Sequence, residues 1–149
     1  MLNEIAYFLR ALIEGIVAVV SIYMLAGRKT VWKVYTGVGF LIGTIAYIVR
    51  LLPVNYGIHT LVILLIMIFV VMGLGKFEFY KAASASIIFM IVLFLSEWLA
   101  ILAIVNICNI STEDILDKSF SGLLIGLVPL ALAFLVIITI HRIKKFSKK

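Results

Sequence analysis

Five long apolar stretches, separated by short polar segments, dominate the pattern of hydrophobic and polar positions along the chain. A helix that crosses a lipid bilayer needs about 20 mainly apolar residues, and each stretch is roughly that long. The pattern therefore predicts an all-α protein, a bundle of five transmembrane helices that forms a single domain over residues 1–149. We expect these helices at about residues 5–26, 34–52, 57–75, 79–107 and 121–140.

The composition agrees with this pattern and excludes a soluble enzyme. Hydrophobic residues make up 65% of the chain and charged residues 13%, and the mean hydropathy is +1.28. An ordinary soluble domain has roughly 45–50% apolar and about 25% charged residues. Such a domain of about 150 residues leaves close to a third of its unfolded surface in water, so it could not hide this much apolar surface.

The distribution of basic residues predicts an orientation in the membrane. Thirteen Lys and Arg against seven Asp and Glu give a net charge of +6. The basic residues cluster in the connections between apolar runs, which indicates the surface of the lipid bilayer and not nucleic acid as their partner. Of these residues only Arg10, Arg50 and Lys118 fall on one side of the predicted membrane. By the positive-inside rule we expect the N-terminus outside and the C-terminus in the cytoplasm.

Four ionisable side chains lie inside or at the edge of the apolar runs: Glu14, Arg50, His59 and Glu97. A charge at the centre of a spanning helix costs about 2.5 to 3.5 kcal/mol or more, so each group needs a partner. All four fall in the outer half of the predicted membrane, with the two glutamates roughly 13 to 15 Å deep. One hypothesis is an outward-facing polar pocket that binds a ligand. The alternative is that these groups, with Arg10 one turn before Glu14, only fix the packing. They would then pair with one another or with Ser96, Asn106 and backbone carbonyls.

Small residues in the predicted helices allow close packing. Gly39 with Gly43, and Gly122 with Gly126, each match the small-xxx-small pattern that lets helices approach closely. We expect this pattern to act within the chain slightly more than between chains, and a homo-oligomer stays open. The segment 111–118, which holds three acidic residues, is expected to be a solvated cap on the outer side.

The chain lacks the residue patterns of membrane enzymes. A cysteine peptidase needs a Cys and a His as nucleophile and base, and Cys108 and His59 both fall near the outer side. The acidic residues that follow Cys108 disfavour the thiolate that such an enzyme uses. The HExxH motif of metalloproteases is missing, and one cysteine with two distant histidines makes no metal site. We therefore expect no enzymatic activity, no metal and no cofactor.

Three short strings resemble a known family, and together with the helix layout the resemblance covers essentially the whole chain. They are LRALIEG at 9–15, RLLPVNYGIHT at 50–60 and LFLSEW at 93–98. They resemble the N-terminal multi-pass sensor region of Firmicutes peptide-sensing histidine kinases of the Agr type. In that family the last spanning helix enters a cytoplasmic kinase module, whereas here it runs out through HRIKKFSKK. The resemblance implies a sensor or accessory protein of the bacterial cytoplasmic membrane, either a fragment of a longer kinase or a stand-alone relative.

The sequence leaves two main functions open. The first is a non-enzymatic sensor or accessory subunit, in which an extracellular signal shifts the helix packing and the basic tail of residues 141–149 contacts a protein partner or anionic lipid. The alternative is a small oligomeric transporter or channel subunit for a cation, a proton or a small solute, with Glu14 and Glu97 along the path. A purely structural membrane component is the third reading.

Overall fold

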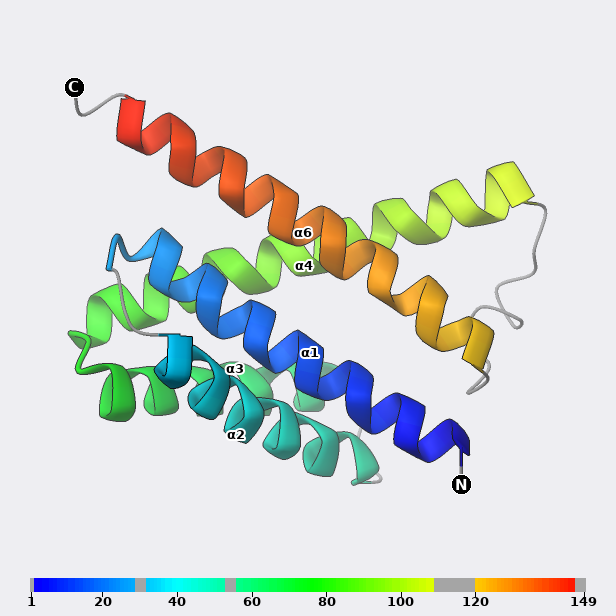
Figure 1. Ribbon diagram of the computed structural model, residues 1–149, viewed down its shortest axis with the longest axis horizontal. Coiled ribbons are helices and arrows are strands. Elements are labelled where there is room, and N and C mark those ends of the chain that lie inside the picture. Colours follow the sequence, from blue (N-terminus) through cyan, green and yellow to red (C-terminus); the bar gives the residue numbers. More distant parts are fainter. Residues whose placement is uncertain (1, 29–31, 53–55, 109–119, 147–149) are drawn as a thin grey trace.

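The computed structural model describes residues 2–28, 32–52, 56–108 and 120–146, and over these residues it holds helices and no strands. Its five helices are shown in Figure 1: α1 (Leu2–Leu25), α2 (Trp32–Leu51), α3 (Tyr56–Gly75), α4 (Phe79–Cys108) and α6 (Phe120–Phe146). All five are long and apolar enough to cross a membrane, which confirms the predicted fold class. The chain is a multi-pass, all-helical membrane protein.

The helix bounds lie within a few residues of those predicted, except at the end of α6. We expected this helix to end near Ile140, but it continues to Phe146. Its last turns hold Arg142 and Lys144, and cations are stabilised near the C-terminus of a helix by its dipole. Pro129 lies inside α6, and the helix continues through it, as membrane helices do when neighbouring groups satisfy the freed carbonyl.

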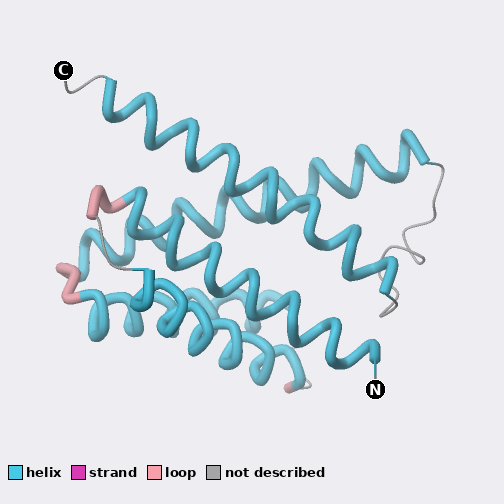
Figure 2. The backbone as a smooth tube through the Cα atoms, in the orientation of Figure 1, coloured by secondary structure: helices cyan, strands magenta, loops and turns pink. Residues whose placement is uncertain are grey.

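The helices form a closed ring in which each packs against the next in the chain and α6 returns to α1. Helix α1 also contacts α4, so α1 and α4 each pack against three other helices. Figure 1 and Figure 2 show that α1 and α6 run in the same direction, whereas α4 runs the opposite way and crosses α6. We call the end where α1 and α6 begin the N-terminal end of the bundle, and the end where they finish the C-terminal end.

One hydrophobic core joins all five helices. Its members include Ile22 of α1, Ile42 of α2, Val71 of α3, Phe89 of α4 and Ile137 of α6, all of them buried. The outward faces of the same helices carry many large apolar side chains that the bundle leaves exposed. In water such surface would drive aggregation, whereas in a bilayer it contacts the lipid chains.

Helix α1 packs most extensively against α2, and glycines make this contact possible. A Cβ built on Gly43 would lie 2.6 Å from the carbonyl oxygen of Ala11 and 2.7 Å from the Cα of Leu12. A Cβ on Gly15 would likewise overlap the backbone of Gly39 and of Gly43. The two helix backbones therefore touch directly, and the predicted Gly39 and Gly43 pattern serves packing within the chain. We call this contact the glycine crossing.

The C-terminal end of the bundle is held by a helix cap and an arginine. Helix α1 ends in a Schellman motif, with Gly27 at a φ of 71° and the N–H of Arg28 bonded back to the last turn of the helix. The Arg28 side chain donates to the carbonyl oxygens of Gly75 and Lys76, at 3.3 and 3.1 Å. Its guanidinium also lies 4.9 Å from the centre of the Phe77 ring. These contacts fix the end of α1 to the turn between α3 and α4.

Candidate functional site

A tight ion pair joins α1 to α2 at the N-terminal end of the bundle. Arg50 donates from Nη2 to Oε1 of Glu14 at 2.6 Å, and from Nη1 to Oε2 at 2.9 Å. Two parallel bonds between a guanidinium and a carboxylate make one of the strongest ion-pair geometries in proteins. The Glu14 side chain is only 16% exposed and that of Arg50 24%. Gly15, the next residue along α1, lies in the glycine crossing, so the pair sits beside direct backbone contact.

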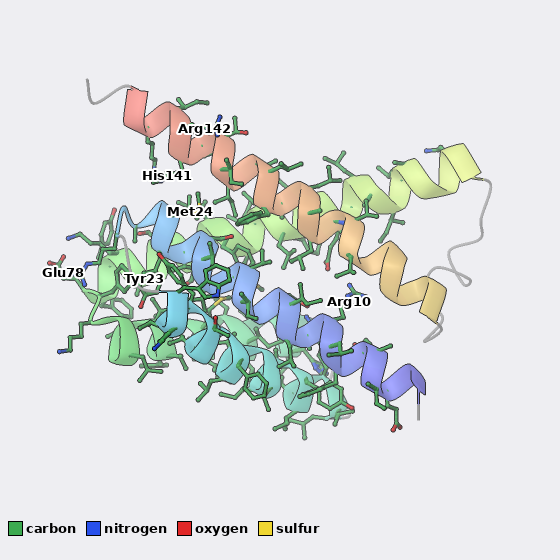
Figure 3. The ribbon with its side chains drawn as sticks, viewed as in Figure 1. Arg10, Tyr23, Met24, Glu78, His141 and Arg142 are labelled. Atoms are coloured by element: carbon green, nitrogen blue, oxygen red, sulfur yellow. The ribbon has the colours of Figure 1, made fainter. Side chains whose placement is uncertain are left out.

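A second, looser ion pair joins α1 to α4. Arg10 Nη2 lies 3.9 Å from Oε1 of Glu97, close to the outer limit for an ion pair. The Glu97 side chain is 40% exposed, so it is more accessible than either member of the first pair. Helix α6 makes room for the guanidinium, because a Cβ on Gly126 would overlap it. Figure 3 shows Arg10 between α1 and α6.

The two ion pairs form one network, which we call the charge network: Arg10, Glu14, Arg50 and Glu97. Arg10 and Glu14 are one turn apart on α1, and Glu97 interacts electrostatically with the other three groups. The network carries two positive and two negative groups, so it is neutral as a whole when all four are ionised. It involves α1, α2 and α4 directly and α6 through Gly126.

Aromatic rings lie near the charge network. Tyr47, one turn before Arg50 on α2, packs edge-on against Phe8 of α1, with ring centres 5.1 Å apart. The ring centre of Tyr7 lies 6.1 Å from that of Tyr47. Tyr7 also interacts electrostatically with Arg50. These ring contacts join α1 and α2 close to the tight pair, which is the less exposed of the two ion pairs.

The structure joins three of the four predicted site residues. Glu14 contacts Arg50 directly, and Glu97 belongs to the same network through Arg10. His59 lies near the start of α3 at the same end of the bundle, where it is half-buried. We considered a pairing of Arg10 with Glu14 along α1, but Arg50 occupies both oxygens of Glu14 and Arg10 lies at Glu97.

Sequence reasoning named Arg10 only as a partner of Glu14, and it treated Gly126 only as a packing residue. The signal for Arg10 was its position one turn before Glu14, together with Glu97 on another helix as a second acid that could bind it. No pattern in the sequence indicates that Gly126 faces Arg10, because this depends on the rotation of α6 about its axis.

Other predicted features fall outside this site or outside the described residues. The acidic segment 111–118 and the side chain of Cys108 lie outside the described residues, so a pairing of Cys108 with His59 stays a sequence hypothesis. Among residues 2–28, 32–52, 56–108 and 120–146, no three His, Cys, Asp or Glu side chains lie close enough to hold a metal ion.

At the opposite end of the bundle, His141 joins α6 to α1. Its Nδ1 lies 2.9 Å from the carbonyl oxygen of Met24. Because a carbonyl oxygen only accepts, Nδ1 donates this hydrogen bond and carries the proton. Figure 3 shows His141 pointing from α6 toward the end of α1.

The contact between Gly126 and Arg10 leads to a prediction about the ion pair of Arg10 with Glu97. In Gly126→Ala the added methyl group displaces the end of a flexible side chain and no backbone, so we expect the protein to keep its unfolding temperature. The displacement opens the pair between Arg10 and Glu97. A double-mutant cycle with Arg10→Gln and Glu97→Gln measures the coupling energy between these two side chains. We expect a coupling below about 1 kcal/mol in the wild type and none in the Gly126→Ala background. A large loss of stability, or an unchanged coupling, would contradict this placement of Arg10.

No family model, curated protein or solved structure matches the chain.

Proposed function

We propose that the protein is a non-enzymatic membrane sensor or accessory subunit, which receives an extracellular signal at the N-terminal end of the bundle and acts through a protein partner. The observation that carries this proposal is that the two ion pairs differ in distance and in exposure. Glu14 and Arg50 satisfy each other with two short hydrogen bonds, whereas Arg10 and Glu97 stand 3.9 Å apart and are more exposed. A ligand that offers shorter contacts to Arg10 and Glu97 replaces their weak mutual interaction at little cost.

The neutrality of the looser pair indicates the chemistry of the ligand. A ligand with only one charge would pair with Glu97 or with Arg10 and leave the other without a partner. The group left behind is partly desolvated in the bundle, so the loss of its counter-ion costs free energy. A zwitterionic ligand, with an ammonium and a carboxylate a few ångströms apart, satisfies both groups at once. A short peptide has this chemistry, which agrees with the resemblance to peptide-sensing kinases.

Ligand binding at this pair would shift the equilibrium between two packings of the bundle. Arg10 belongs to α1 and lies against α6, and Glu97 belongs to α4, so a ligand between them favours one relative position of three helices. The bias of basic residues toward the C-terminal end supports an orientation with that end in the cytoplasm and the charge network in the outer half of the membrane. The basic tail of α6 is then the part available to a cytoplasmic partner.

Trp98, next to Glu97 on α4, provides a reporter for this proposal. We expect the peptide fraction of spent culture medium to change the Trp98 emission of the full-length protein in nanodiscs, saturably, in a Trp32→Phe background. Glu97→Gln should abolish the response, and Glu78→Gln, which removes an exposed acid at the opposite end of the bundle, should leave it intact. No response in the wild type, or an equal response in Glu97→Gln, refutes ligand binding at this pair.

A companion measurement tests the protein partner. Gentle solubilisation of native membranes, affinity purification of the intact protein and mass spectrometry should recover a kinase or regulator at constant stoichiometry. Recovery of only this chain, as a defined oligomer, would contradict the accessory role.

Two buried serines favour a second candidate, a transporter or channel subunit for a proton or cation. Ser21 and Ser86 are fully buried, and among the described residues their hydroxyls have no hydrogen-bond partner. They lie on α1 and α4, the helices of Glu14 and Glu97, further toward the C-terminal end. Proteoliposomes distinguish the two functions: the sensor predicts no flux above that of protein-free vesicles. Flux that disappears in Glu14→Gln and Glu97→Gln would establish the transporter instead.

A further inference from the structure

A groove with two lysines lies at the C-terminal end of the bundle, far from the charge network. It measures about 160 Å³ and opens to the surface between α1, α4 and α6. Its polar rim is formed by Lys81 and Ser84 of α4 and by Lys144 of α6. Its apolar wall includes Leu25, at the end of α1, and Ile88 of α4. The volume equals that of about five liquid water molecules of about 30 Å³ each, enough for a phosphate group but not for a folded segment.

The position of the groove along the bundle coincides with the edge of the membrane. The spanning segment of α1 ends at Leu25, that of α4 begins at Phe79 and that of α6 ends at Lys144. The lysines therefore stand at the level of the lipid headgroups, and the apolar wall continues from them into the hydrocarbon region. A soluble anion gains nothing from such a wall, whereas a phospholipid places its acyl chains against it.

The charges around the groove are available to an anionic ligand. Among the described residues, no acidic side chain lies within ion-pair distance of Lys144. Glu78 is the one acid near Lys81, at 3.0 Å, but both of these side chains are exposed, and such pairs contribute little to stability. The Ser84 hydroxyl donates only to the carbonyl oxygen of Lys81 one turn earlier, at 3.3 Å, and can turn to an anion.

The carbonyl oxygen of Met24 near the end of α1, which would repel an anion, is satisfied by hydrogen bonds beside the groove. The carbonyl oxygen of Met24 accepts the N–H of Gly27 in the helix cap and also the Nδ1–H of His141. His141 lies one turn before Lys144, so the residue that covers this carbonyl and the lysine at the rim belong to the same part of α6.

We propose that this groove binds an anionic phospholipid. Its phosphate lies between the ammonium groups of Lys81 and Lys144, with Ser84 as a further donor, and its acyl chains lie along Leu25, Ala85 and Ile88. Basic pockets between transmembrane helices at the cytoplasmic side have this chemistry in general. The bound lipid bridges α4 and α6 beside the end of α1. This proposal concerns the opposite end of the bundle from the charge network and does not depend on the proposed function.

Native mass spectrometry of the full-length protein, titrated with phosphatidylglycerol or phosphatidylcholine, tests the proposal. We expect the first phosphatidylglycerol to bind at least about tenfold more tightly than phosphatidylcholine. Each basic residue near a membrane surface contributes about 1 kcal/mol, which is about fivefold in affinity, so Lys81→Gln with Lys144→Gln should weaken phosphatidylglycerol binding about thirtyfold. The matched control is Lys33→Gln with Lys76→Gln, which removes two exposed lysines from the same end of the bundle and should change binding by less than about threefold.

Three outcomes would overturn the proposal. Equal binding of the two lipids would exclude recognition of the headgroup charge. An equal loss of phosphatidylglycerol affinity in the control variant would mean that net charge at this end of the bundle, and not the groove, attracts the lipid. Displacement of phosphatidylglycerol by inorganic phosphate at similar concentration makes the site one for free anions.

A second measurement avoids the lysine variants in case they do not fold. In Ser84→Cys with Cys108→Ser, phosphatidylglycerol should protect the single thiol from a maleimide at least about fivefold better than phosphatidylcholine does. Equal labelling in the two lipids places the anionic lipid elsewhere.

Discussion

Gly43→Ala should destabilise the bundle strongly, because the added methyl group would overlap backbone atoms of α1. The new Cβ would lie 2.6 Å from the carbonyl oxygen of Ala11 and 2.7 Å from the Cα of Leu12, and neither of these backbone atoms can move without the whole helix. Helices α1 and α2 must separate, and the ion pair between Glu14 and Arg50 stretches with them. We expect a loss in the free energy of unfolding at the upper end of the range for overpacked cores, about 3 kcal/mol or more, measured by reversible unfolding in bicelles.

Gly37→Ala is the matched control, because Gly37 lies on the same helix and nothing lies within 4 Å of a Cβ built there. Alanine has a higher helix propensity than glycine by up to about 1 kcal/mol, so this variant should be as stable as the wild type or slightly more stable. If both variants have the same free energy of unfolding, the α1 and α2 backbones do not touch as described.

Arg50→Met should also cause a large loss in the free energy of unfolding. It leaves the Glu14 carboxylate, only 16% exposed, without its partner, and breaking a buried ion pair costs about 3 to 5 kcal/mol. Adding Glu14→Gln should restore most of the lost stability, because neither position then carries a charge. The free energy of unfolding of the two single variants and the double variant measures both effects.

The exposed pair of Glu78 and Lys81 provides the comparison, since Glu78→Gln there should leave the unfolding temperature unchanged. A double variant as unstable as Arg50→Met alone would mean that the arginine acts by packing and not by charge. If Arg50→Met is as stable as the wild type, the tight pair does not stabilise the fold.

The number and approximate bounds of the helices could be predicted, because the length of apolar runs is fixed by the thickness of the bilayer. The tight pair could be predicted in part: a buried acid such as Glu14 needs a cation, and Arg50 lies at the right depth. The choice of Glu97 for Arg10 could not be predicted, because it depends on the rotation of α4 about its axis. The lysine groove depends on side chains near the ends of two helices that meet only in the folded bundle, so no local pattern indicates Lys81 and Lys144 together.

The cap that fixes α1 to the turn between α3 and α4 leaves the two ends of the bundle mechanically different. Helices α4 and α6 cross within the bundle, and near one end of this pair Arg28 and His141 hold the neighbouring segments in place. A movement of α1 at this end would break the two hydrogen bonds of Arg28 and its contact with the Phe77 ring. A movement of α6 relative to α1 would break the hydrogen bond from His141 to Met24. We therefore expect α6 to shift more easily than α1 at the C-terminal end of the bundle.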